Sequence, residues 1–154
     1  MKPFIVLIIT FTLHLLAYRI IKGNYNFALA ARVAMSVMLL FTAIGHFAFT
    51  KGMIMMLPEF IPYKIFVIYL TGVIEIAAAV GLFIPDIRQV TAWLLIVFFI
   101  LILPANIRAA IHQVDYQKGT FEGDGLNYLW FRVPLQLFFI SWVYLSAIYK
   151  YPYK

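Results

Sequence analysis

Apolar positions run almost without interruption along most of this chain, and short polar or proline-containing segments divide them into long stretches. Each stretch is close to or longer than the roughly 20 residues that an α-helix needs to cross the hydrocarbon core of a bilayer. The five predicted helices cover residues 3–21, 27–50, 64–83, 87–111 and 128–149. The pattern therefore predicts an all-α polytopic membrane protein with short connections.

Local signals set the expected helix boundaries. Asn24 or Asn26 can cap the second helix, because an Asn side chain accepts a hydrogen bond from the free N–H groups of a first turn. Pro85 is expected to end the third helix, and Asp86 to cap the fourth. Since only a few residues separate these two helices, they are predicted to form an antiparallel hairpin.

The connection at residues 51–63 is unusual, because it is apolar and yet contains Gly52, Pro58 and Pro62. These residues exclude one continuous helix. The segment is too apolar for an ordinary aqueous loop, so we interpret it as an interfacial or re-entrant element that lies over the helices. The one clearly hydrophilic connection is 113–127, which holds three of the six acidic residues.

Composition narrows the class of protein. Of the 154 residues, 65% are hydrophobic and 12% are charged, against about 45–50% and about 25% in soluble domains. No room remains for a separate aqueous domain, so we interpret residues 1–154 as a single membrane domain. The chain has no cysteine, which excludes disulfides and thiolate metal sites; a redox role would need a bound cofactor or a partner.

Charge points to lipid as the partner. The formal net charge is +6, but the 12 basic residues are scattered over the helix ends, as expected for contact with lipid headgroups and not with nucleic acid. Four Lys or Arg residues lie on the side of the N-terminus and five on the other side. The counts hardly differ, and the acidic connection 113–127 favours the second side as cytoplasmic.

The first apolar stretch admits two interpretations. Lys2 followed by a short apolar run is typical of a cleaved signal peptide. We favour a retained transmembrane helix over residues 1–26, because Arg19 and Lys22 mark a helix end and no small-x-small cleavage motif precedes the second helix.

Glu75 is the most costly residue to place in a membrane. It lies 11 residues after Lys64, which is about 16 Å along a helix and near the middle of a core about 30 Å thick. An ionisable side chain at that depth is expected to face the protein interior and to mark a functional site. If the carboxyl is charged, Arg132 is its expected ionic partner.

Four further polar residues are expected near one end of the helices. His46 ends a polar stripe on the second helix, Asn106 follows Pro104 on the fourth, and Arg132 and Gln136 share a face of the fifth. With Glu75 deeper below them, they predict a polar pocket that opens to the side of the N-terminus. The alternative is structural, since polar side chains also hydrogen-bond between membrane helices.

Other chemistries find no support in the sequence. The chain has three histidines, but none forms a local ligand pair such as H-x-x-x-H, so no metal site is predicted. There is also no serine–histidine signature, no glycine-rich phosphate loop and no carboxylate pair at the spacing of a hydrolase.

Several motifs occur in an order that resembles the DoxX-like family of small integral membrane proteins. They are GHF at 45–47, MMLPEFIP at 55–62, YLTGVIEIAAAVGLFIP at 69–85, LPANI at 103–107 and LWFRVPLQ at 129–136. The resemblance covers residues 27–149 and implies a four-helix bundle core in a bacterial inner membrane, to which residues 1–26 add one N-terminal transmembrane helix. It also favours the second side as cytoplasmic.

The resemblance leaves three functions open. The family is named after a small subunit associated with thiosulfate:quinone oxidoreductase, and other members resemble accessory subunits. The first function is an accessory subunit that binds a hydrophobic small molecule, a quinone or a lipid, in the predicted polar pocket, with a membrane oxidoreductase partner or a homo-oligomer. In that function His46, Asn106 and Gln136 hydrogen-bond the ligand, Arg132 sets the electric field and Glu75 transfers a proton.

The two alternatives differ in class. One is a membrane-embedded acid–base enzyme that acts on a lipidic substrate, with Glu75 and His46 as the catalytic residues that exchange protons. The other is a purely structural assembly subunit, in which small-residue faces serve helix contacts.

Overall fold

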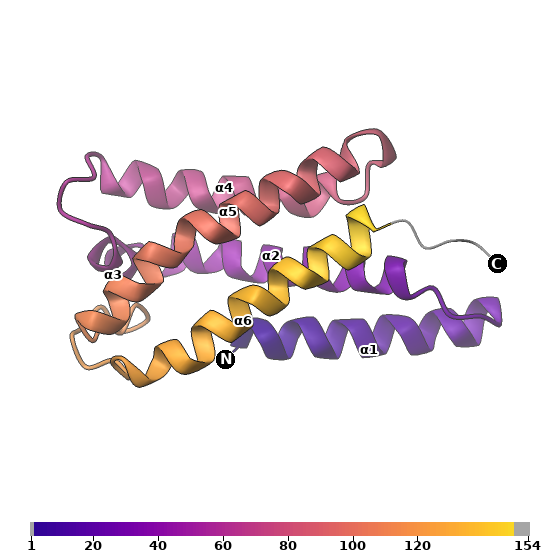
Figure 1. The fold of residues 1–154 in the computed structure, drawn as a ribbon, viewed down its shortest axis with the longest axis horizontal. Coiled ribbons are helices and arrows are strands. Elements are labelled where there is room, and N and C mark those ends of the chain that lie inside the picture. Colours follow the sequence, from indigo (N-terminus) through magenta and orange to yellow (C-terminus); the bar gives the residue numbers. More distant parts are fainter. Residues whose placement is uncertain (1, 150–154) are drawn as a thin grey trace.

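The structure, a computed structural model, describes residues 2–149 and is all-α over that range, as predicted. Most of the chain lies in long helices joined by short connections (Figure 1). The helices are α1 (Lys2–Lys22), α2 (Phe27–Ala48), α3 (Thr50–Met56), α4 (Lys64–Gly81), α5 (Pro85–Ile111) and α6 (Asn127–Val143), and a π-helical turn, η1 (Tyr144–Ile148), continues α6.

Five helical stretches are long and apolar enough to cross a membrane: α1, α2, α4, α5 and the stretch Asn127–Ile148. They coincide with the five spans expected from the sequence. Many of their large apolar side chains are exposed, among them Ile9, Leu13, Val73 and Leu94. Such a surface suits lipid contact better than water, so length, composition and exposure together indicate a multi-pass membrane protein.

Successive long helices run in opposite directions, so the connections gather at two ends (Figure 1). One end, which we call the α3 end, carries α3, the connection 57–63 and the connection 112–126. Lys2 at the start of α1 donates a hydrogen bond to Gln117 Oε1 at 3.2 Å, which places the beginning of α1 against the last of these connections. The α3 end thus corresponds to the first side of the sequence analysis.

Helix α2 packs against both α1 and α4, while α5 packs against α6 and η1. The fully buried large side chains come from α1, α2, α5 and α6 and from the residue that follows α4: Leu7, Met35, Met38, Leu39, Leu82, Leu95 and Val143. Small residues bring α2 and α4 close together. A Cβ added at Gly72 would lie 3.0 Å from His46 Cβ, and Ser36 donates a buried hydrogen bond to Ala79 O at 2.9 Å.

Two predicted caps have different outcomes. Asn26 caps α2, because its side chain accepts a hydrogen bond from Leu29 N at 3.0 Å. The prediction that Asp86 caps α5 is wrong: α5 begins at Pro85, and the N-cap is Ile84 in an extended conformation. A residue before proline is driven out of the helical region, and proline fits the first helical position. Asp86 therefore lies inside the first turn.

The apolar segment 51–63 is not one continuous helix, as predicted. Helix α3 follows α2 after a bend at Phe49 and ends at Met56, before Pro58. Gly52 lies so close to the connection 112–126 that an added Cβ would be 2.0 Å from Tyr116 O. The segment therefore packs onto the other connection at the α3 end.

Tyr116 gives this connection an expected pH response. Burial raises the pKa of the Tyr116 phenol above its ordinary value of 10.0, and Tyr128 adds to the effect. A raised pKa in the folded state means that the stabilisation is complete below pH 10 and is lost as the pH rises through the folded pKa. We expect the thermal stability of Tyr116→Phe to fall less above pH 10 than that of the parent.

Ultraviolet absorbance of tyrosinate during alkaline titration is the direct measurement. The parent should show one late-ionising tyrosine that is absent from Tyr116→Phe and still present in Tyr25→Phe, whose ring is half exposed. A late component that survives in Tyr116→Phe would contradict the assignment.

Candidate functional site

Glu75 meets His46 where α4 crosses α2. The carboxyl is 5% exposed, and its Oε2 atom lies 3.4 Å from His46 Nε2. This is an ion-pair distance, longer than a good hydrogen bond, and Glu75 Oε2 has no hydrogen-bond partner among the described residues. The two residues expected to carry chemistry are therefore neighbours, and the pair is incompletely satisfied.

Thr71 contacts the other ring nitrogen of His46. Its Oγ1 lies 3.0 Å from His46 Nδ1 and donates a hydrogen bond to Ile68 O at 2.8 Å. A hydroxyl has one hydrogen, so with that hydrogen on Ile68 O the bond to Nδ1 requires the hydrogen to be on the ring. With the hydroxyl hydrogen turned to Nδ1 instead, the ring hydrogen of His46 is on Nε2, so both tautomers fit the contact with Thr71.

In either tautomer Nε2 of His46 faces the carboxyl of Glu75, and Thr71 sets the orientation of the ring. An imidazole and a carboxyl in this arrangement have the chemistry for proton exchange.

The side chains of His46 and Glu75 meet, although their backbones are offset along the helices. His46 lies beside Thr71 and Gly72, about one helical turn nearer the α3 end than Glu75, so Glu75 lies farther from that end than His46. Helix α2 ends two residues after His46, whereas α4 begins at Lys64, about 16 Å along the axis from Glu75. The end of α2 therefore lies partway along α4, and α3 with the connection 57–63 completes that side.

Asn106 and Gln136 direct their amide groups to the backbone of α5. Asn106 Nδ2 donates to Ile102 O at 3.0 Å, and Gln136 Nε2 donates to Phe99 O. Both acceptors precede Pro104 in α5. Because Pro104 has no N–H, the carbonyl that lacks its helical donor is that of Ile100. The two amides therefore bond other carbonyls of α5 than the one that the proline leaves free. Within residues 2–149, Gln136 Oε1 is buried without a hydrogen-bond partner.

The expected partnership of Arg132 with Glu75 is not formed, because the structure gives that place to His46. Arg132 Nε is buried and has no hydrogen-bond partner in the part of the chain that the structure describes, and its charge acts on the Tyr116 phenol in the connection 112–126. Arg132 therefore belongs to the α3 end, away from the carboxyl.

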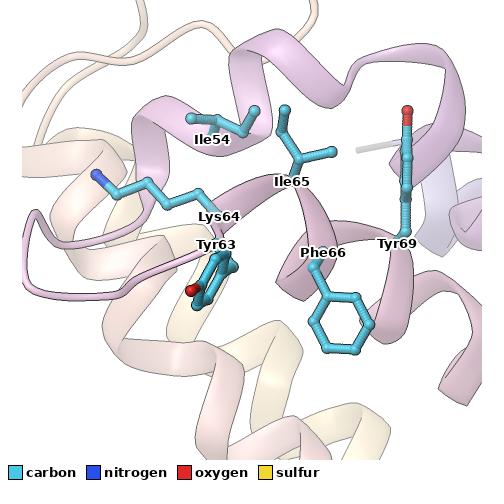
Figure 2. A pocket seen from close by; sticks show the side chains of 6 residues that line it. All are labelled: Ile54, Tyr63, Lys64, Ile65, Phe66 and Tyr69. Carbon is cyan, nitrogen blue, oxygen red and sulfur yellow. The ribbon is translucent and has the colours of Figure 1, made fainter.

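Two grooves lie on the surface near the α3 end. The first, of about 580 Å³, is almost wholly apolar and is lined by Ile54, Tyr63, Lys64, Ile65, Phe66 and Tyr69 (Figure 2). The ammonium end of Lys64 points away from Phe66 and Tyr69. The second, of about 780 Å³, is lined by Pro58, Glu59, Phe60, Pro104, Ile107, Arg108, Ile111 and His112. None of the five predicted site residues lines either groove, so their common polar pocket stays a prediction.

The first groove reaches the neighbourhood of the polar pair through one aromatic contact. The ring of Tyr69, on the groove, stacks on Phe47 at 5.5 Å between centroids, and Phe47 follows His46 directly in α2. Gly72 of α4 lies against both His46 and Phe47. An apolar surface thus adjoins a buried polar pair at the α2–α4 contact.

Sequence reasoning missed Thr71 as a functional residue and saw it only as a small neighbour of Glu75. The available signal was its spacing: Thr71 is four residues before Glu75, so both lie on one face of α4. Glu59 was also missed, because an exposed acid in a connection has no distinguishing pattern.

One family comparison bears on this arrangement. A family model described as "Domain of unknown function (DUF8561)" matches residues 35–147. The chain belongs to this family. The matched range runs from α2 to η1 and includes His46, Thr71 and Glu75. No curated protein and no solved structure matches the chain.

Proposed function

We propose that this DUF8561 protein is a small accessory subunit of a bacterial inner membrane that binds a hydrophobic ligand, a quinone or a lipid, beside His46 and Glu75. The observation that carries the proposal is the buried Glu75 Oε2, which lacks a hydrogen-bond partner while an imidazole faces it at 3.4 Å. An unsatisfied buried polar atom is destabilising by about 1–3 kcal/mol. A polar group on a ligand would complete the pair.

The surroundings of the pair suit a ligand with an apolar body. The groove that ends at Tyr69 is apolar, and the Phe47 ring connects it to His46. A quinone carbonyl would accept a hydrogen bond from the His46–Glu75 pair, and a lipid hydroxyl would donate to Glu75 Oε2. The motif order that resembles the DoxX-like family supports the accessory-subunit interpretation.

Among the other predicted ligand residues, Asn106 and Gln136 already use their N–H groups on α5. Only their side-chain oxygens therefore remain to bind a ligand. Of these, Gln136 Oε1 is buried and has no hydrogen-bond partner among the described residues. Arg132 contributes charge at the α3 end.

The imidazole that faces a buried carboxyl favours one second candidate, an acid–base enzyme that acts on a lipidic substrate. His46 and Glu75 would then accept a proton from one position of the substrate and return it at another. Glu75→Gln separates the candidates, because it abolishes proton exchange while it keeps size and polarity. An enzyme would retain its ligand in this variant without turnover.

The test is to extract the gently purified protein with organic solvent and to identify bound small molecules by mass spectrometry. We expect a quinone or a defined lipid in the parent and its loss from the Glu75→Gln, His46→Ala double variant. Thr42→Val is the matched control, because Thr42 bonds only carbonyls of its own helix. A parent without any retained ligand, or equal retention in the double variant, would reject the site.

A further inference from the structure

The second groove combines a charge pair with an apolar wall. It lies between the connection 57–63 and the last turns of α5. Arg108 Nη2 and Glu59 Oε1 are 3.9 Å apart, too far for a hydrogen bond. The Glu59 side chain is 94% exposed, so this pair contributes little to stability.

The guanidinium of Arg108 donates no hydrogen bond to the described part of the chain. Its Nε atom is buried without a partner, and Glu59 at 3.9 Å is its only ionic neighbour. A guanidinium presents five N–H donors in a planar fork that matches phosphate oxygens. Arg108 therefore places hydrogen-bond donors at the groove for which the described part of the chain provides no acceptor.

The apolar wall continues from this charge pair along α5. Ile107 and Pro104 lie within about one helical turn before Arg108, and Phe60, 84% exposed, faces them from the connection. If α5 spans the bilayer, its last turn and the hydrophilic connection that follows lie at the level of the lipid headgroups. The groove then offers polar groups at headgroup depth and apolar groups at the depth of the first acyl carbons.

We propose that this groove binds a zwitterionic phospholipid with a primary ammonium group. The phosphate takes the place of the distant carboxylate at Arg108, the ammonium donates to Glu59, and an acyl chain lies on Ile107, Pro104 and Phe60. One acid and one base match the two charges of such a headgroup. An anionic headgroup leaves Glu59 unpaired, and a quaternary ammonium has no N–H to donate. This site is separate from the His46–Glu75 pair.

Native mass spectrometry with added lipids of identical acyl chains tests the proposal. The probes are phosphatidylethanolamine, phosphatidylcholine and phosphatidylglycerol. We expect the first to bind about tenfold more tightly than the second, the ratio that one charge-assisted hydrogen bond supports. Glu59→Gln should remove this preference, and Arg108→Gln should weaken all three. Glu122→Gln, which removes an exposed acid outside the groove, is the matched control.

Three results would overturn the proposal: equal binding of the three lipids, a preference for phosphatidylglycerol, or an unchanged preference in Glu59→Gln. If a variant does not fold, stepwise N-methylation of the phosphatidylethanolamine headgroup tests the parent alone, and affinity should fall as N–H groups are lost. The lipid preference should persist in Glu75→Gln, which distinguishes this site from the proposed ligand site.

Discussion

Replacing His46 and Glu75 together is expected to destabilise the protein less than the sum of the two single replacements. His46→Leu leaves a buried carboxyl with neither a proton acceptor nor a cation beside it, and loss of one partner of a buried pair costs about 3–5 kcal/mol. Glu75→Met leaves His46 with Thr71 alone. The double variant has no polar group to satisfy, so most of the penalty disappears.

The measurement is thermal unfolding of the four proteins in one detergent, treated as a double-mutant cycle. We expect a coupling of about 1–3 kcal/mol between His46 and Glu75. The pair of the exposed Glu59 and the partly exposed Arg108 gives the comparison, since its coupling should stay below about 1 kcal/mol. Additive effects at His46 and Glu75 would show that the two side chains do not interact.

The same double-mutant cycle can be measured in variants of Thr71. Thr71→Val removes the hydroxyl that orients the imidazole but keeps the shape of the side chain. The coupling between His46 and Glu75 should then shrink, and Thr71→Ser should restore it. Thr42→Val, which removes a hydroxyl that bonds only α2 carbonyls, should leave the coupling unchanged.

The helices were predictable because their signal is local. The length of an apolar stretch fixes whether it can span a bilayer, and Asn26 caps α2 by a contact within its own turn. Asp86 shows the limit of this reasoning. Its type suits a cap, but Pro85 occupies the first helical position, so the N-cap is Ile84, two residues before the expected cap.

The contents of the site were predictable and their pairing was not. Glu75 was found because a carboxyl in the middle of an apolar helix is costly, and His46 because it ends a polar stripe. Which residue faces Glu75 depends on how far α4 extends beyond the end of α2. That offset is set by Gly72, which lets the two helices approach, and by the bend at Phe49, and neither is visible in hydrophobic periodicity.

The amides illustrate a second kind of limit. Asn106 and Gln136 have the chemistry of ligand-binding residues, and the sequence places them near one end of the helices. In the structure both side-chain amides donate to backbone carbonyls of α5. A sequence pattern cannot distinguish an amide that is free to bind a ligand from one that donates to a backbone carbonyl such as Phe99 O or Ile102 O.

Gly52→Ala is expected to destabilise the protein more than an Ala substitution at a helical glycine with free space. A Cβ at Gly52 would lie 2.0, 2.5 and 2.7 Å from the backbone O, C and Cα atoms of Tyr116. No side-chain rotation relieves such a contact, so the connection 112–126 must move away from α3. Overpacking of this kind costs about 1–3 kcal/mol, and occasionally more.

Gly45→Ala is the matched control, because the nearest atom to its added Cβ is Met53 Cε at 3.5 Å, an ordinary contact with a flexible side chain. In the interior of α2 this change should be neutral or stabilising by up to about 1 kcal/mol. Thermal unfolding measures both effects, and limited proteolysis of residues 113–126 should accelerate in Gly52→Ala alone. Equal stability of the two variants would mean that α3 does not pack on this connection, since a backbone contact at 2.0 Å leaves no room for a methyl group.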